Sequence, residues 1–153
     1  MDRLAKTLAS YGIWVLIFLT CPPLFVVALL TWLVLLVAMV AAGAFRVAVV
    51  APRLSSFGTE VAGALLGLVV ILALTRPFIR SLERPTLPTL VVIGALWLGL
   101  TVAFEFGFFH YVGGRSWESL LEQYDVGKGH LWPFVLAAVA ATPFVWRRRA
   151  SRA

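Results

Sequence analysis

The feature that most constrains this chain is the absence of any charged residue between Lys6 and Arg46. An uncharged apolar run of this length suits helices that cross a bilayer. The rest of the chain repeats the pattern, because 61% of its residues are hydrophobic and only 13% are charged. A soluble domain of this size could not keep so much apolar surface out of water. The sequence therefore predicts an all-α polytopic membrane protein that forms a single domain over residues 1–153.

The motif Cys21-Pro22-Pro23 divides the uncharged run, because proline removes a backbone donor and clashes with the preceding helical turn. We expect an apolar or amphipathic N-terminal segment over 1–23 and a first transmembrane helix over 24–45. One long kinked helix is the alternative, so the sequence leaves open whether residues 4–20 span, kink or lie on the membrane. No clear A-x-A cleavage site or lipobox is present, and we expect the segment to be retained. The single cysteine is expected to be a small buried hydrophobe.

Three further apolar stretches predict transmembrane helices over 59–78, 89–109 and 131–146. A short polar connection is expected between the first two spans, and Pro143 predicts a kink or an early stop in the last one. The second helix carries the GxxxG pair Gly63 and Gly67, which lets two helix backbones approach closely in lipid. Packing within the bundle is the favoured interpretation of this pair. A homo-oligomer or a partner membrane protein is the alternative.

The basic residues predict the orientation of these four helices. With both termini in the cytoplasm, nine basic residues lie inside: Arg3, Lys6, Arg76, Arg80, Arg84, Arg147, Arg148, Arg149 and Arg152. Four lie outside: Arg46, Arg53, Arg115 and Lys128. This bias follows the positive-inside rule. Because the basic residues stand in short flanks of apolar runs, the net charge of +6 marks topology, and no nucleic-acid partner is expected.

Under this topology each helix places an ionisable residue at the outer membrane boundary. The expected polar cluster consists of Arg46, Arg53, Glu60, Thr101, Glu105, His110, Tyr111 and His130. Glu105 is the most informative, since it lies inside the apolar string FEFGFF, where an unpaired carboxylate would be costly. We expect Arg46 or Arg53 to pair with it and Thr101, one turn earlier, to donate a hydrogen bond. The cluster either fixes the register of the bundle or binds a small ligand or ion.

Patterns of known chemistry are not found in this cluster. Glu105, His110 and His130 lack the HExxH or CxxC spacing of a zinc site. Ser116 and Ser119 lie near acidic residues, but nothing resembles GxSxG. We therefore expect no metal, no cofactor and no catalytic residue.

The connection between the last two spans predicts a short helix over 116–125. Ser116 can cap it, and its apolar residues follow at helical spacing: Trp117, Leu120, Leu121 and Tyr124. Such a helix is expected to lie in the membrane interface with Trp117, Leu120 and Leu121 facing inward. It serves either as a re-entry helix that covers hydrophobic side chains or as a lid or docking surface for a partner.

The string EFxFxHYVxGxSWxxLLxxYxxxxGxLW, from Glu105 to Trp132, resembles the C-terminal signature of small bacterial four-helix membrane proteins. The resemblance extends back to GAFRVAVVAPRL (43–54) and covers 24–146. Phe109 and Lys128 are local variations on the pattern. The resemblance implies a four-helix fold in the bacterial cytoplasmic membrane and carries no activity.

Three functions are compatible with these features. The first is a membrane protein without enzymatic activity that binds a small apolar or amphiphilic ligand, or a partner membrane subunit, at its outer face. The second is a proton-coupled transporter that uses Glu105, although the acidic residues lie at one boundary and mark no path through the membrane centre. The third is an enzyme acting on lipid or quinone, with Glu105 and His110 as acid and base. Beyond the lipid bilayer, the sequence specifies no partner.

Overall fold

A computed structural model describes residues 22–82 and 85–150 of the chain. These residues contain helices and turns and no strand. In chain order the elements are α2 (Pro22–Phe45), the π-helical turn η1 (Arg46–Val50), α3 (Ser56–Ser81), α4 (Leu87–Tyr111), α5 (Trp117–Glu122), the 3-10 turn η2 (Val126–Lys128) and α6 (Trp132–Ala150). The expected N-terminal segment and Cys21 lie outside the described residues, apart from the two prolines with which α2 begins.

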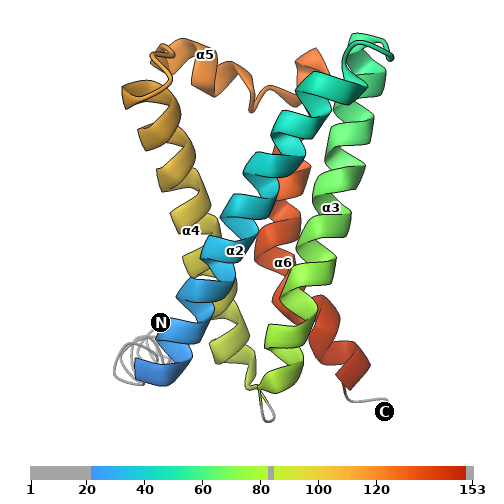
Figure 1. Cartoon of the computed structure of the whole chain (residues 1–153). Helices are drawn as coiled ribbons and strands as arrows, with labels where there is room; N and C mark the ends of the chain where they lie inside the picture. Colours follow the sequence, from blue (N-terminus) through green and yellow to red (C-terminus); the bar gives the residue numbers. More distant parts are fainter. Residues whose placement is uncertain (1–21, 83–84, 151–153) are drawn as a thin grey trace, which may run out of the picture.

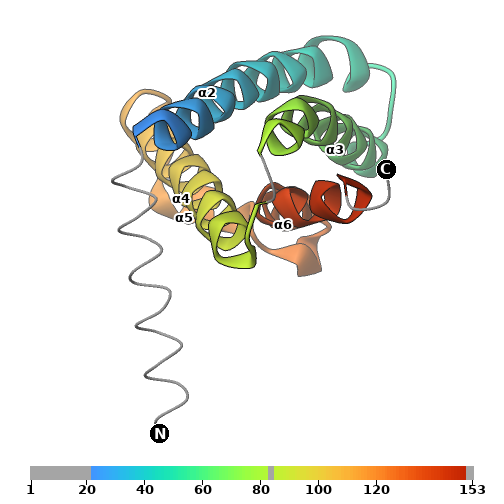
Figure 2. The same cartoon turned by 90° about the horizontal axis from the view of Figure 1, so that it is seen from below.

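The four long helices form a bundle, and α5 lies across one end of it (Figure 1). Seen along the bundle, they follow the order α2, α3, α6 and α4 (Figure 2). Helix α6 packs along both α3 and α4, and α3 packs along α2, whereas α2 and α4 touch only over a short stretch. The two diverge toward α5 (Figure 1). The end of the bundle that α5 covers is called the α5 end below.

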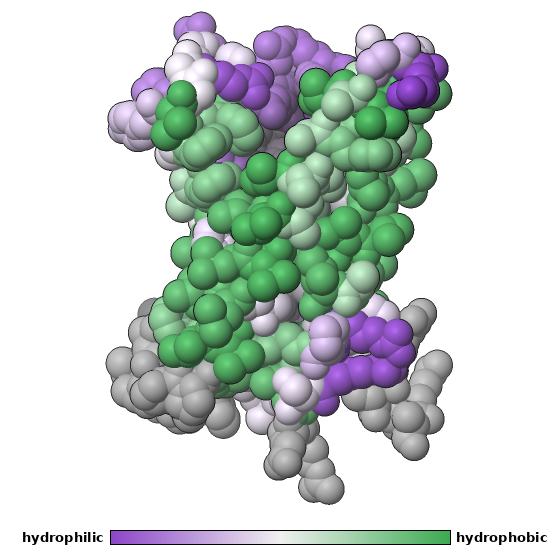
Figure 3. Space-filling model, in the orientation of Figure 1, coloured by the Kyte–Doolittle hydropathy of each residue, from purple (hydrophilic) through white to green (hydrophobic). Residues whose placement is uncertain are grey.

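Three of the helical stretches are long and apolar enough to cross a membrane: Leu24–Val50, Ser56–Ser81 and Leu87–Tyr111. On the face that Figure 3 shows, hydrophobic residues cover the middle and polar residues gather toward the two ends. This distribution is the one a bilayer requires, since lipid tails offer no partner to a polar side chain. The chain is thus a helical protein of the membrane-spanning type.

Two tryptophans join α2 to α4 where these helices do meet. The indole of Trp97 on α4 is fully buried and donates a hydrogen bond from Nε1 to the carbonyl oxygen of Ala28, at 2.9 Å. One turn along, Nε1 of Trp32 on α2 donates to Oγ1 of Thr101, at 3.1 Å. Both donors are therefore satisfied within the bundle, as buried indole groups usually are.

Glycines allow close contacts at two other places in the bundle. A β-carbon at Gly94 of α4 would overlap with the backbone carbonyl oxygen of Ala140 on α6. On α3, a β-carbon at Gly63 would overlap with the Arg46 side chain, and one at Gly67 would lie 3.2 Å from Cε of Met39. The GxxxG pair thus packs against the same chain, as the interpretation of internal packing expects.

The expected end of the first helix agrees with the structure, since α2 ends at Phe45. The residues after it continue as the π-helical turn η1, in which Ala51 N–H donates to Arg46 O at 2.9 Å. The connection to α3 is correspondingly shorter than expected. The expected end of the last helix at Trp146 was wrong, and of the two effects expected of Pro143, a kink or an early stop, the early stop does not occur. Pro143 is fully buried, and α6 continues to Ala150.

Candidate functional site

A cavity of about 420 Å³ lies inside the bundle toward the α5 end. The cavity exists because α2 and α4 diverge and leave a space that neither helix fills. Residues of all four long helices line it. The part of the wall toward the bundle centre is apolar and includes Trp32, Leu35, Met39, Ile71, Val135 and Val139. A volume of this order is typical of sites for small organic ligands.

The α5 end of the cavity is polar. Its lining includes Arg46, Glu60, Glu105, Arg115, Gln123, His130 and Trp132. The cavity therefore has a polar end and an apolar end, which are the two environments that an amphiphilic molecule needs.

Glu105 connects this polar end to the segment that covers it. Its oxygen Oε2 accepts two hydrogen bonds, one from the hydroxyl of Tyr124 at 2.8 Å and one from Nε1 of Trp132 at 2.9 Å. Tyr124 follows α5 and Trp132 begins α6, so a single carboxylate oxygen fastens both ends of the connection between them. Glu105 therefore faces other residues of the protein, as expected.

The expected ion pair between Glu105 and Arg46 was wrong. Arg46 binds Glu60 instead, with Nη1 and Oε1 2.9 Å apart and 32% of each side chain exposed. The reason lies in the packing, since η1 contacts α3 whereas α2 and α4 diverge toward this end. Thr101 also has other partners than expected: its hydroxyl donates to Trp97 O at 2.7 Å and accepts from Trp32.

The remaining residues of the expected cluster divide between the cavity and its surroundings. Thr101 and His130 line the cavity. His110 instead orders the loop after α4: its Nδ1 lies 2.8 Å from Arg115 O, and its ring stacks on Trp117 with centroids 3.9 Å apart. Tyr111 is 79% exposed, and Arg53 bonds the backbone of its own turn at Val49 O. The expected cluster thus combines cavity residues with residues that lie outside it.

The short helix between α4 and α6 forms as expected, but only partly with the expected orientation. Leu120 is buried, whereas Trp117 is 47% and Leu121 is 60% exposed. A helix of six residues can turn only one narrow stripe toward the bundle. Leu120 occupies that stripe, and Tyr124 follows four residues later, just after the helix ends at Glu122. The predicted inward orientation is thus confirmed for Leu120 and wrong for Leu121, whereas the half-exposed Trp117 packs its ring against His110 and Phe106 of α4.

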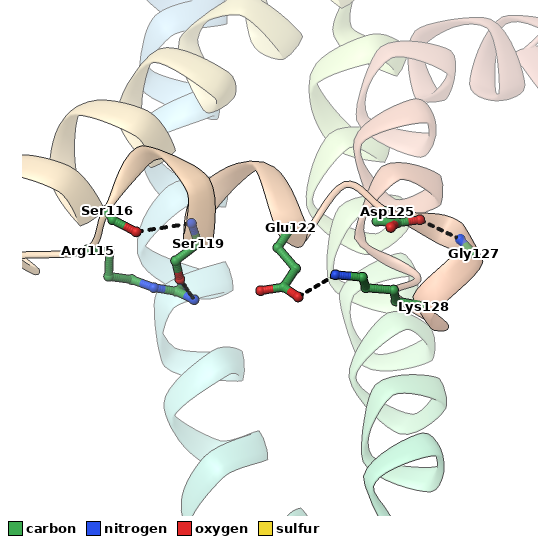
Figure 4. A network of polar contacts seen from close by, with 7 residues as sticks. All are labelled: Arg115, Ser116, Ser119, Glu122, Asp125, Gly127 and Lys128. Carbon is green, nitrogen blue, oxygen red and sulfur yellow. Dashed lines mark hydrogen bonds and ion pairs between the residues drawn. The ribbon is translucent and has the colours of Figure 1, made fainter.

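Polar contacts fix the segment that contains α5 (Figure 4). Ser116 caps the helix by accepting from Ser119 N–H at 3.2 Å, and Nη2 of Arg115 donates to Ser119 Oγ at 3.1 Å. Beyond the helix, Nζ of Lys128 lies 2.6 Å from Oε1 of Glu122. The Lys128 ammonium lowers the pKa of Glu122, and Glu122 in turn raises the pKa of Lys128.

Tyr124 stays protonated over the whole physiological range. Burial raises the pKa of its hydroxyl above the ordinary value, and the nearby Glu105 carboxylate adds to this effect. A raised pKa keeps the phenol as a hydrogen-bond donor, which is the role it has toward Glu105. The bond between the α5 segment and α4 therefore does not depend on pH through Tyr124.

Sequence reasoning missed several cavity residues, above all Arg115, Gln123 and Trp132. Trp132 and Tyr124 carry a signal that could have identified them, because both are aromatic donors in the same stretch as a carboxylate in apolar surroundings. In the described part of the chain, no three histidine, cysteine or acidic side chains come together in a way that could hold a metal ion.

Comparisons with known protein families, curated proteins and solved structures give no match for this chain.

Proposed function

We propose that this chain is an integral membrane protein without enzymatic activity that binds a small amphiphilic molecule in the cavity at its α5 end. The observation that carries the proposal is the division of one cavity into an apolar part inside the bundle and a polar part beneath α5. An apolar pocket with a few polar groups at one end suits a ligand with a hydrocarbon part and a polar head.

The ligand enters from the bilayer, between α2 and α4. Support comes from Val40 on α2 and Phe109 on α4, which both line the cavity and are 56% and 36% exposed. These two residues mark the edge of the cavity on the side where the helices have diverged. Lateral entry suits an amphiphile because such molecules concentrate in the membrane.

In this proposal α6 is the fourth transmembrane helix, and both ends of the chain lie in the cytoplasm of a bacterium. The apolar stretch 133–146 and its packing against α3 and α4 support the fourth span. The excess of basic residues at the opposite end from α5 supports the orientation. The resemblance to small bacterial four-helix membrane proteins supports the location in the cytoplasmic membrane. The cavity then opens in the outer half of the bilayer.

Quenching of tryptophan fluorescence by a brominated dodecanol tests the proposal, because Trp32 and Trp132 line the cavity. The protein in nanodiscs should show saturable quenching. Ala64→Phe, which adds a ring inside the cavity, should weaken the apparent affinity by about tenfold or more. Ala73→Phe is the matched control, since Ala73 is exposed on the same helix and lies outside the cavity lining.

Saturable quenching in the wild type and Ala73→Phe, with a large loss in Ala64→Phe, would support the site. Quenching that grows linearly with the probe and is equal in all three proteins would report partition into lipid only. That result would refute the proposal.

A further inference from the structure

The carboxylate of Glu105 has only neutral hydrogen-bond donors around it. Both donors, the Tyr124 hydroxyl and the Trp132 indole, bond to Oε2. Among the described residues, no hydrogen bond reaches the other oxygen, Oε1, although Glu105 lines the cavity. Two donors on one oxygen stabilise the anion, but they do not neutralise its charge.

The cationic side chains at the polar end of the cavity have other contacts. Arg46 forms an ion pair with Glu60 at 2.9 Å. Arg115 donates to Ser119 and places its guanidinium over the ring of Phe109, 6.0 Å from the centroid. The two ion pairs among the described residues, Arg46–Glu60 and Glu122–Lys128, do not include Glu105. The carboxylate at the polar end of the cavity thus has no cation from the described part of the chain as its counter-ion.

We propose that the head group of the ligand is a primary ammonium, which donates to Oε1 of Glu105 and forms the ion pair that this carboxylate lacks among the described residues. This inference rests on the proposed function, since it names the chemical class of the amphiphile that the cavity binds. An ammonium group is also a strong donor, and an ion pair with hydrogen bonds is worth more in partly buried surroundings than in water.

The size of the cavity limits the hydrocarbon part to one chain. If each heavy atom takes the roughly 30 Å³ that a water molecule occupies in the liquid, 420 Å³ holds about 14 heavy atoms. A single-chain alkylamine of about twelve carbons matches this volume. Its chain lies between α2, α3 and α6, against Met39, Ile71 and Val135.

Competition against the brominated dodecanol tests the head group. Dodecylamine, dodecanol and dodecanoate have the same chain length and differ in the head. In the wild-type protein dodecylamine should displace the probe at about one tenth of the dodecanol concentration, and dodecanoate should be the weakest competitor. In Glu105→Gln the advantage of dodecylamine over dodecanol should disappear.

Glu118→Gln is the matched control, because it removes one negative charge from an exposed residue of α5 outside the cavity lining. It should keep the full preference for the amine. A loss of preference in Glu118→Gln equal to that in Glu105→Gln would overturn the inference, because surface potential would then explain it.

The wild-type series decides the question even if Glu105→Gln fails to fold. Equal competition by the amine and the alcohol, or stronger competition by dodecanoate, would overturn the ammonium head and leave the cavity as a site for other amphiphiles. If none of the three displaces the probe, the proposed function itself fails.

Discussion

The hydrogen bond from Tyr124 to Glu105 should keep the α5 segment closed over the cavity, and Tyr124→Phe removes it with little other change. Phenylalanine keeps the aromatic ring that stacks on Phe106 at 5.7 Å and loses only the hydroxyl, which donates to Oε2 at 2.8 Å. Trp132 continues to donate to the same oxygen, so the carboxylate keeps one partner.

The size of the effect follows from the type of bond. A hydrogen bond to a charged group contributes about 1.5–3 kcal/mol. Since each 1.36 kcal/mol changes an equilibrium constant tenfold, the open population of the α5 segment should rise about ten- to hundredfold.

Cysteine labelling measures that population. Leu120 is only 3% exposed, so a cysteine at this position reacts when the α5 segment opens. The reference protein is Leu120→Cys combined with Cys21→Ser, which removes the single natural cysteine. Adding Tyr124→Phe should raise the labelling rate by the factor given above.

Tyr111→Phe is the control, because it removes a tyrosine hydroxyl from the same region at a residue that is 79% exposed. It should leave the labelling rate unchanged. An equal rate in the reference protein and in Tyr124→Phe would refute the idea that Glu105 fastens the segment through this bond.

Three further predictions concern the bundle and its surface. Gly94→Ala should lower the free energy of unfolding by about 1–3 kcal/mol, because the new β-carbon overlaps with the Ala140 backbone. Gly99→Ala should not lower it, because the space around Gly99 is open. Equal losses of stability in the two variants, measured by thermal unfolding in detergent, would contradict this prediction. Arg46→Gln and Glu60→Gln should each lower the thermal stability, because each leaves the other charge unpaired. The double variant should recover part of this loss, since it leaves no charge unpaired. Strictly additive losses would contradict the ion pair. The Glu122–Lys128 ion pair should be present at neutral pH and lost as the pH falls through the lowered pKa of Glu122. Lys128→Gln should raise the pKa of Glu122 in an NMR titration. An unchanged pKa would show that the pair does not form.

The positions of the helices could be predicted from the sequence because hydrophobic length and flanking charge determine where a chain can cross lipid. Three of the expected spans correspond to α2, α3 and α4, which are long and apolar enough to cross a membrane, and the residues of the fourth form α6. The expected cap at Ser116 is present. The gathering of Arg46, Glu60, Glu105 and His130 around one cavity also follows from their common position near the same end of the helices.

The pairing of these residues could not be predicted, because it depends on how the helices are rotated and on where they diverge. Arg46 and Glu105 both line the cavity, yet Arg46 binds Glu60 because α2 and α4 diverge toward this end. The partners of Glu105 are the neutral donors Tyr124 and Trp132, and a search for opposite charges does not find such donors.

Photo-crosslinking tests the central claim, that an amphiphile occupies the cavity, most directly. The probe is dodecanol with a diazirine at the end of its chain, and mass spectrometry locates the adducts in the protein in nanodiscs. The adducts should fall on the apolar end of the cavity, at Trp32, Ile71 and Val139, and excess unlabelled dodecanol should suppress them. Adducts confined to exposed surface residues such as Val37 and Val69, with no suppression, would contradict the account.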